Sequence, residues 1–373
     1  MTSTINATTG GLQISNDDSA ILALGTNGNP GITLDGSQVA TLSKYLGFAD
    51  GSFLASGNSL GLRNRIINGD CKINQRGYGS TAITSSAIYT GYDRYIYLDT
   101  TGSTTVSQST ISIGGLTYDC NTTNITTVPT FVSSSVIEGC SQLIEGYNCY
   151  DLLGWPVTVS FLFETNLAGT YSVALRDQNG KNSCVKSFTA IAGSQLVSIT
   201  FPPLPTGLNV PLNVSYGLQL DIAAIGGSNF ITPTEGAWVS GNFVYTSSST
   251  NWSATLNNYI AATLIQVEKG PVATPFEFRP SAVEMMLCQR YYWAGDVYLQ
   301  GYQIASSRIK GVVPNFGTMA GIPTGAVITA SQSNSNSDPL FETSTTGSFL
   351  SVSAAATGSL YYNAQVSLDA ELT

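Results

Sequence analysis

The stretches VSYGLQLDI (214–222) and VTVSFLF (157–163) place apolar residues at every second position. This spacing puts the apolar side chains on one face of a β-strand. The stretch YSVAL (171–175) follows the same pattern, and the turn sequences DQNG (177–180) and GGSN (226–229) lie between such runs. Short strands separated by turns favour a sandwich over a βαβ fold. We therefore predict a jelly-roll-like β-sandwich over residues 64–280.

The composition agrees with an all-β chain. Charged residues make up 10% of the 373 residues, and Ser, Thr, Asn and Gly supply most of the polarity. These side chains compete with helical backbone bonding and suit turns and short strands. The length predicts two or three domains.

The charge and residue inventory argues against several classes of function. A net charge of -9 leaves no basic stripe for nucleic acid, and the absence of histidine removes the commonest general base and metal ligand. No apolar run is long enough to span a bilayer, and the start does not have the form of a signal peptide. We expect no catalysis, cofactor, metal or membrane insertion. The six cysteines show no disulfide framework, so we predict free thiols.

Residues 1–63 are predicted to form an attachment and oligomerisation segment. The apolar pairs Leu12/Ile14, Leu22/Leu24 and Ile32/Leu34 recur every ten residues and mark strands too short to bury a face alone. Stacking on identical copies would bury them, although a flexible arm is the alternative. A short helix is expected to follow, capped by Ser37 and with Val39, Leu42 and Leu46 on one stripe. Residues 50–62 are expected to be a linker.

Residues 281–373 are predicted to form a small C-terminal β domain. Ser281 and Glu284 have the spacing of a capping box, which predicts a short helix at its start. The runs AVIT (326–329) and FLSV (349–352) are predicted strands, and the polar stretch 331–338 is predicted to be an exposed loop.

Two sequence blocks resemble bacteriophage tail-fibre and related virion proteins. The first is NRIINGDCKINQRG (64–77), followed by YDRY (92–95). The second is QVEKGPVATPFEFRP (266–280), continued by LCQRYYW (287–293). Tyr95 stands where the family pattern has an aromatic residue, often Trp. The resemblance covers about 220 residues and implies a β-sandwich in a virion fibre, commonly trimeric, with host recognition near the C-terminus.

The polar residues of both blocks are expected to brace the fold. Asn68, Gly69 and Asp70 have turn chemistry, and the scarce charges are expected to form paired contacts that pin the ends of the sandwich. The further residues assigned to this structural motif are Gln75, Arg76, Asp93, Arg94, Glu277, Arg279, Gln289 and Arg290.

The leading functional hypothesis is a homotrimeric fibre that joins other virion proteins through its N-terminus and binds a host-surface glycan or protein. Aromatic faces stack on sugars, and the candidates are Tyr291, Tyr292, Trp293, Tyr298 and Tyr302, unless these side chains fill an interface between domains. Such a chain would be assembled in the bacterial cytoplasm.

Two alternatives remain open at this point. One is a head fibre, collar fibre or adaptor that never contacts the receptor. The other is a tailspike-like glycan depolymerase that uses two carboxylates as acid and base. Its pool of candidates is Asp93, Asp99, Glu138, Glu145 and Asp151.

Overall fold

The structure is a computed structural model. It describes residues 62–373 except 78, 84–87, 138, 305–306, 314–317, 336–338 and 373, and of residues 1–61 only the backbone of seven short strands. The chain divides into two compact units, Met1–Arg63 and Asn64–Thr373. None of the helices in the described residues is long and apolar enough to cross a bilayer.

The first unit contains a five-stranded antiparallel meander in the order β1-β2-β3-β4-β5 and a separate pair, β6 and β7. The register aligns Ile14 with Leu24, Leu24 with Ile32 and Ile32 with Leu42. Leu12 lies outside the described residues. The strands are β1 (Ser3–Asn6), β2 (Gln13–Asn16), β3 (Leu22–Thr26), β4 (Asn29–Leu34), β5 (Ala40–Leu42), β6 (Leu46–Gly47) and β7 (Phe53–Leu54).

Two predictions for this unit need correction. Where the structure describes the segment after Ser37, strands β5 and β6 replace the expected helix, because Leu42 pairs with Ile32 of β4 and Leu46 pairs with Leu54 of β7. Ser37 and Val39 lie outside the described residues. The expected linker 50–62 contains β7.

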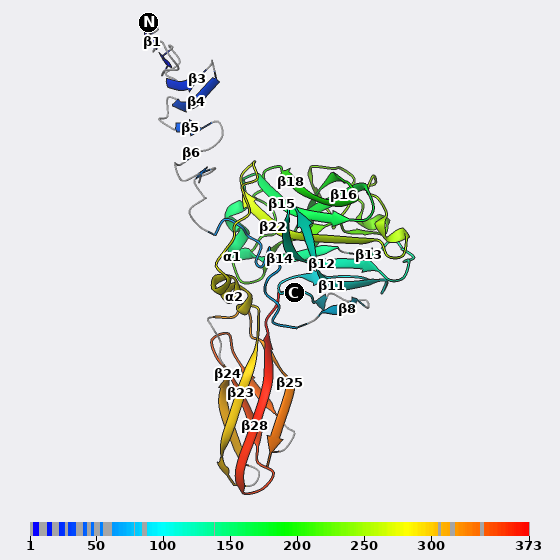
Figure 1. Cartoon of the computed structure of the whole chain (residues 1–373), viewed down its shortest axis with the longest axis vertical. Coiled ribbons are helices and arrows are strands. Elements are labelled where there is room, and N and C mark those ends of the chain that lie inside the picture. The colour runs from blue at the N-terminus through cyan, green and yellow to red at the C-terminus, as the bar shows by residue number, and fades with distance from the viewer. Residues whose placement is uncertain are drawn as a thin grey trace. The chain divides into compact units, whose positions relative to one another are not determined.

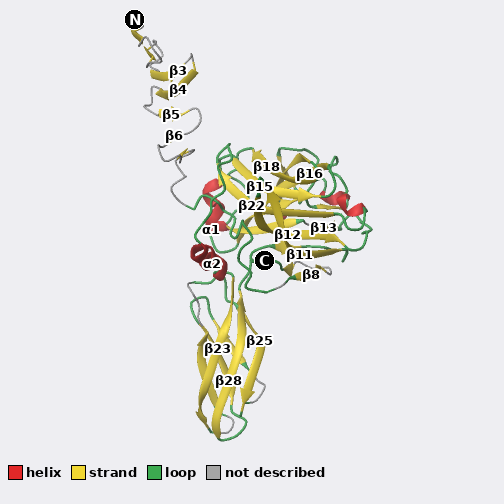
Figure 2. Cartoon of the chain, viewed as in Figure 1, coloured by secondary structure: helices red, strands yellow, loops and turns green. Residues whose placement is uncertain are grey.

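The second unit begins with two packed sheets (Figures 1 and 2). One has the order β21-β17-β16-β19-β14-β10-β9 and the other β18-β15-β22-β12-β11-β8, with a small pair β13-β20 beside them. The strands are β8 (Ser80–Ile83), β9 (Ile88–Tyr89), β10 (Ile96–Tyr97), β11 (Thr104–Ile113), β12 (Leu116–Ile125), β13 (Val136–Ile137), β14 (Cys140–Glu145), β15 (Val157–Thr165), β16 (Gly169–Asp177), β17 (Asn182–Ala190), β18 (Gly193–Phe201), β19 (Tyr216–Ile222), β20 (Ile225–Gly226), β21 (Trp238–Ser240) and β22 (Tyr259–Lys269). Short helical segments are α1 (Gly146–Cys149), η1 (Tyr150–Leu152), η2 (Gln178–Gly180), η3 (Ser228–Phe230) and η4 (Trp252–Ala254).

The strand connections make this sandwich a jelly roll. Leaving aside the short β13, β20 and β21, the chain from β12 to β22 crosses between the sheets so that β12-β22-β15-β18 are neighbours in one sheet and β14-β19-β16-β17 in the other. The register is antiparallel throughout. This arrangement of eight strands in two Greek keys is the jelly-roll topology, so the predicted all-β sandwich is confirmed.

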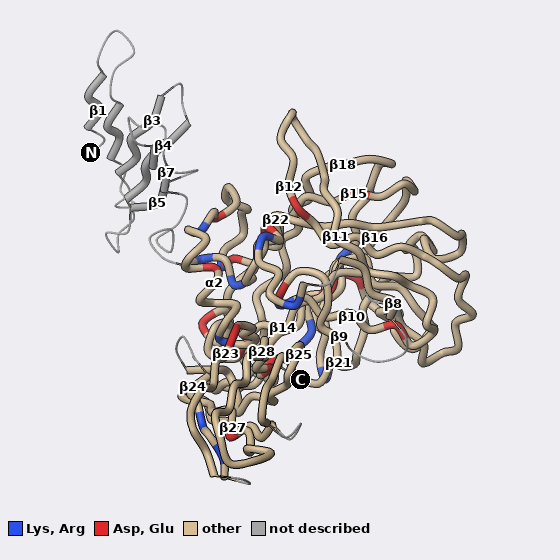
Figure 3. The backbone as a smooth tube through the Cα atoms, turned by 60° about the horizontal axis from the view of Figure 1, so that its bottom comes forward, with Lys and Arg blue, Asp and Glu red and all other residues tan. Residues whose placement is uncertain are grey.

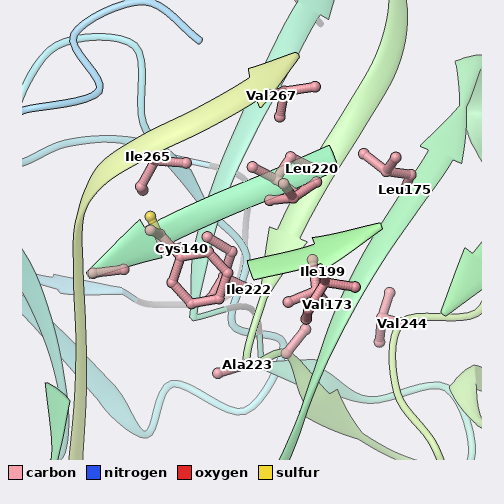
Figure 4. Packing of buried hydrophobic residues seen from close by; sticks show 14 of the residues in the cluster. Cys140, Val173, Leu175, Ile199, Leu220, Ile222, Ala223, Val244, Ile265 and Val267 are labelled. Atoms are coloured by element: carbon pink, nitrogen blue, oxygen red, sulfur yellow. The ribbon is translucent and has the colours of Figure 1, made fainter. Parts of the chain in front are cut away.

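The core fills the space between the two sheets. The alternating residues of 157–163 and 214–222 that predicted strands supply much of it, and Val159, Phe161 and Leu218 are almost fully buried. Figure 4 shows Val173 and Leu220 among these side chains, together with the Cys140 thiol.

A helix and a second, smaller β domain follow. Helix α2 (Ser281–Gln289) begins directly after Pro280, and Ser281 makes no capping bond, so the predicted capping box is absent. Glu284 instead accepts hydrogen bonds from Asn68 and Arg279. The six remaining strands form sheets β23-β28-β25 and β24-β27-β26 around a separate apolar core. They are β23 (Tyr292–Gln303), β24 (Arg308–Val313), β25 (Thr324–Ser333), β26 (Leu340–Thr343), β27 (Ser348–Ser353) and β28 (Gly358–Asp369).

Strand β25 is longer than predicted. It extends beyond 326–329 to Ser333, so the expected loop 331–338 begins as a strand, and 336–338 lie outside the described residues.

Candidate functional site

The first sequence block forms a tight turn around Asn68. Its side-chain amide donates to the carbonyls of Ile73 and Asp93, while its Oδ1 accepts from the backbone of Lys72 and Ile73. Asn68 has φ 59°, a conformation that Asn tolerates better than most residues. At Gly69 an added Cβ would lie 2.3 Å from the carbonyl oxygen of Ile265, so the backbones can approach only with glycine here.

The closing block packs against this turn. Glu277 accepts a 2.9 Å hydrogen bond from the Asn64 backbone N–H. Arg279 donates to the carbonyls of Asn64 and Ile66 and lies 3.3 Å from Glu284. The two ends of the jelly roll are therefore joined to each other and to helix α2.

Asp93 and Gln75 connect the jelly roll to the C-terminal domain. Asp93 accepts from the backbone N–H and the side-chain amide of Gln75, at 3.0 and 2.7 Å. The same amide donates to the carbonyl of Tyr292 at 2.7 Å. Asp70 lies within the turn, 3.5 Å from the ammonium of Lys72.

Two arginines of the first block bind the end of the chain. Arg76 lies 3.2 Å from Asp369 and 3.3 Å from Glu371, and its guanidinium stacks on the ring of Tyr292 at 3.8 Å. Arg94 pairs with Glu371 and stacks on Tyr291 at 3.5 Å. Burial alone would lower the pKa of Arg94, but the charge of Glu371 raises it above its ordinary value.

A further ion pair contacts the hydroxyl of Tyr291. Arg290 donates to both oxygens of Glu145, at 2.9 and 2.7 Å, and the Tyr291 hydroxyl donates to the same carboxylate at 2.7 Å. Gln289 is the last residue of α2 and directly precedes Arg290, and its side chain is half-buried. We call the set Gln75, Arg76, Asp93, Arg94, Glu145, Arg290, Tyr291, Tyr292, Asp369 and Glu371 the junction.

The junction was only partly visible in the sequence. Its arginines and Asp93 belong to the quoted blocks, whereas Glu145, Asp369 and Glu371 do not and were not expected in it. Figure 3 shows charged positions around α2 and the C-terminus, where these residues meet. The sequence around Asp369 and Glu371 does not indicate that these carboxylates contact Arg76 and Arg94, which lie almost three hundred residues earlier.

Three of the five aromatic candidates for sugar stacking are interior residues. Tyr291, Tyr292 and Trp293 are 0%, 7% and 5% exposed, because the two tyrosines cover the arginines of the junction and Trp293 joins the core of the C-terminal domain. Their rings are not accessible to a ligand, and the glycan-binding prediction is corrected for these residues.

Tyr298 and Tyr302 are on the surface, 66% and 72% exposed. Both lie on strand β23, and Tyr361 on the neighbouring strand β28 is 40% exposed. The register pairs Tyr298 with Asn363, Gln300 with Tyr361 and Tyr302 with Ser359, so all three rings share one outer face. We call this surface the tyrosine face. Tyr361 was missed in the sequence because it lies some sixty residues after the other two.

The carboxylates proposed for a depolymerase lie on separate segments of the chain, and the described ones bind neighbouring protein groups. Burial raises the pKa of Asp93, but this residue is 1% exposed and both its oxygens accept from Gln75. Asp99 accepts hydrogen bonds within the turn 101–104, Glu145 belongs to the junction, and Asp151 pairs with Arg65 at 2.8 Å. Glu138 lies outside the described residues. No group of metal-ligating side chains occurs in the part of the chain that the structure describes.

No family model and no curated protein matches the sequence. Among solved structures, the enzymatically active domain of tailspike protein 4 from bacteriophage CBA120 overlaps 55% of this chain and 21% of its own length, at 10% identity and a TM-score of 0.27. The chain thus spans about a fifth of that protein.

Two carbohydrate-related structures overlap to a similar degree. A putative sugar binding protein from Bacteroides thetaiotaomicron covers 56% of this chain and 100% of its own, at 11% identity and a TM-score of 0.28. A family 11 carbohydrate-binding module from Clostridium thermocellum, solved with a β-1,3-1,4-mixed-linked tetrasaccharide, covers 52% and 100%, at 12% and 0.24. These TM-scores are too low to support any inference about the ligand of this chain.

Proposed function

We propose that this chain is a structural component of a bacteriophage appendage that attaches to the host surface by binding rather than by catalysis. The observation that carries the proposal is the junction. Both sequence blocks that resemble tail-fibre proteins converge there, and together with the last residues of the chain they fix the C-terminal domain to the jelly roll.

A fixed connection suits a protein that transmits force between a particle and a cell. Arg76 and Arg94 are 5% and 1% exposed at their side chains, so both are desolvated and depend on the carboxylates of the tail. Removing one partner of such a pair is far more costly than removing a surface pair. The C-terminal domain therefore resists detachment without a disulfide.

The burial and the protein partners of the acidic residues favour a binding role over a depolymerase. An acid and a base for glycoside hydrolysis must both reach the sugar from opposite sides. The described candidates bind neighbouring protein groups, and Asp93 and Asp99 are each 1% exposed. Turnover of purified host polysaccharide provides the check, because a binder leaves the chain length of the polymer unchanged.

The first unit would supply assembly with copies of itself and attachment to other virion proteins. Its strands are two to six residues long, and such strands gain stability by extending across neighbouring copies. A homotrimer, as in the proteins the two blocks resemble, is part of this proposal.

The experiment that tests the function is localisation on the intact particle. Gold-labelled antibodies against residues 64–373 should decorate an external appendage, and their position separates a tail fibre from a head or collar fibre. Purified particles that carry no copy of the chain would refute the proposal.

A further inference from the structure

We propose that the tyrosine face binds an uncharged glycan, lying along strands β23 and β28. This inference rests on the proposed function and names the ligand class and the surface that would recognise it.

The three rings are spaced along one outer surface of the sheet β23-β28-β25. Tyr298 and Tyr302 are four residues apart on β23, about 13 Å along the strand. Tyr361 lies opposite Gln300, between them, and is diagonal to each at about 7–8 Å. A ligand that stacks on all three must be extended, which a linear or sparsely branched sugar chain satisfies.

Hydrogen-bonding groups surround the rings. Gln300 and Gln365 are exposed, Asn363 is half-buried, and β25 adds Ser331 and Ser333, which the register places beside Asn363 and Tyr361. Amides and hydroxyls can each both donate and accept, which matches the hydroxyls of a sugar. The apolar face of a sugar ring would lie on the tyrosine rings while its hydroxyls bond these neighbours.

The charge of the surface restricts the ligand class. Strands β23, β25 and β28 contain no Lys or Arg, and their only charges are Asp296 and Asp369. The two cations that follow Tyr291 in the sequence, Arg308 and Lys310, lie on β24 in the other sheet, where Arg308 binds Ser351 and Lys310 pairs with Glu342 at 2.5 Å. Anionic glycans and phosphorylated head groups are therefore disfavoured, because nothing on this face would neutralise them.

The rival occupant is a second copy of this chain. Apart from the tyrosines, the large apolar side chain exposed on strands β23, β25 and β28 is Ile328, whereas the other outer face of the domain exposes Val312, Leu340 and Phe349. Interfaces that hold identical copies together have more apolar centres than their surroundings. The amide-rich face is thus the weaker candidate for self-association.

The test is affinity electrophoresis of the full chain through gels that contain one soluble polysaccharide each. Dextran, mannan and laminarin are the uncharged probes, and alginate, hyaluronate and polygalacturonate are the anionic ones. At least one uncharged probe should retard the chain. Tyr302→Ala and Tyr298→Ala should each weaken retardation on the order of tenfold, whereas Tyr302→Phe should retain most of it because the ring remains.

Tyr147→Ala is the matched control. Tyr147 lies on α1 of the jelly roll and is 55% exposed, so its removal should leave retardation unchanged. Thermal unfolding followed by circular dichroism should show that the exposed substitutions do not alter folding, and light scattering should show an unchanged mass.

Four results would overturn the inference. Retardation by anionic probes alone would contradict the ligand class. Retardation that is unchanged in both Tyr298→Ala and Tyr302→Ala would contradict the assignment of the binding surface. The absence of retardation by every probe of both sets would also contradict it. A change of mass in Tyr302→Ala would assign the face to contacts between copies. Each of these leaves localisation on the particle unaffected, so failure here is distinguishable from failure of the proposed function.

Discussion

Arg94 and Glu371 form a buried ion pair across 277 residues of sequence. Arg94 belongs to the first block of the jelly roll, and Glu371 lies two residues beyond the last strand of the C-terminal domain. The nearby backbone supports the pair, because Ala370 donates to the carbonyl of Tyr291 at 2.7 Å and Tyr89 donates its hydroxyl to the carbonyl of Leu372 at 2.7 Å. The second unit therefore closes on itself at the junction between the jelly roll and the C-terminal β domain.

The first prediction concerns the strength of this pair. Glu371→Gln should lower the free energy of unfolding by about 3–5 kcal/mol, because it leaves the buried guanidinium of Arg94 without its carboxylate. Arg94→Met should lower it by less, because Glu371 keeps Arg76 at 3.3 Å. The double variant should lose less than the sum of the two. Chemical denaturation of the four proteins gives the coupling free energy, which should lie at about 0.5–3 kcal/mol.

The exposed pair Arg65 and Asp151 supplies the control cycle. Asp151 is 48% exposed at its side chain, so the coupling free energy of this pair should be about 0–1 kcal/mol. If the cycle of Arg94 and Glu371 gives no more than the control cycle, the ion pair does not hold the two domains together.

The second prediction is an acid-sensitive turn at Asp99. Burial would raise the pKa of this carboxyl, but hydrogen bonds from Thr101, Ser103 and Thr104 lower it below its ordinary value of 3.8. Because the unfolded chain then binds this proton more readily, the stabilisation is complete above about pH 3.8 and is lost as the pH falls towards the lowered folded value. Asp99→Asn should reduce the loss of melting temperature between pH 6 and pH 3.

Thr101→Val tests the cause. It removes the 2.6 Å hydrogen bond from the Thr101 hydroxyl to Asp99 and should have the same effect on the pH profile, only smaller. An unchanged profile in Asp99→Asn would show that other groups govern the acid response.

The third prediction is that the thiols are free and unreactive in the folded chain. All six cysteines are buried and unpaired. Burial raises the pKa of Cys149 and of Cys184 to about 12, which leaves little of the nucleophilic thiolate. Iodoacetamide without reductant should therefore modify none of them quickly in the native protein and all six after denaturation. Mass spectrometry that finds fewer than three modified cysteines in the denatured chain would contradict this.

Much of the fold could be predicted from the sequence because the sandwich follows local rules. Period-two alternation at 157–163 and 214–222 predicts strands, and the turn residues between such runs mark where they end. The segment after Ser37 was harder, since Leu42 and Leu46 fit a helical stripe and a strand equally, and pairing with a neighbouring strand decides between them.

The site was less predictable because it depends on contacts between residues that are far apart in the sequence. Alternation alone could not tell which aromatics of 291–302 point inwards, since Tyr292 has the outward parity of Tyr298 and is nevertheless covered by Arg76. Tyr361 is exposed and its neighbour Tyr362 is buried. Which of the two faces outwards is determined by the register of β28 with β23.

The fourth prediction is that residues 1–63 drive oligomerisation. The full chain should have the mass of a trimer by light scattering, because the short strands of the meander gain partners from neighbouring copies. Deletion of residues 1–63 should leave a folded fragment of lower mass. A full-length chain with the mass of one copy would contradict oligomerisation, and a stable dimer or hexamer would contradict only the stoichiometry.

The most direct test of the account is competition for host attachment. Bacteria that support the particle carrying this chain should adsorb fewer particles after incubation with the purified full-length protein, because its C-terminal domains would occupy the surface glycan. Tyr302→Ala should need on the order of tenfold more protein for the same block, while Tyr147→Ala should match the parent. Adsorption that stays unchanged at saturating concentrations of the parent chain would contradict the claim that this protein binds the host surface.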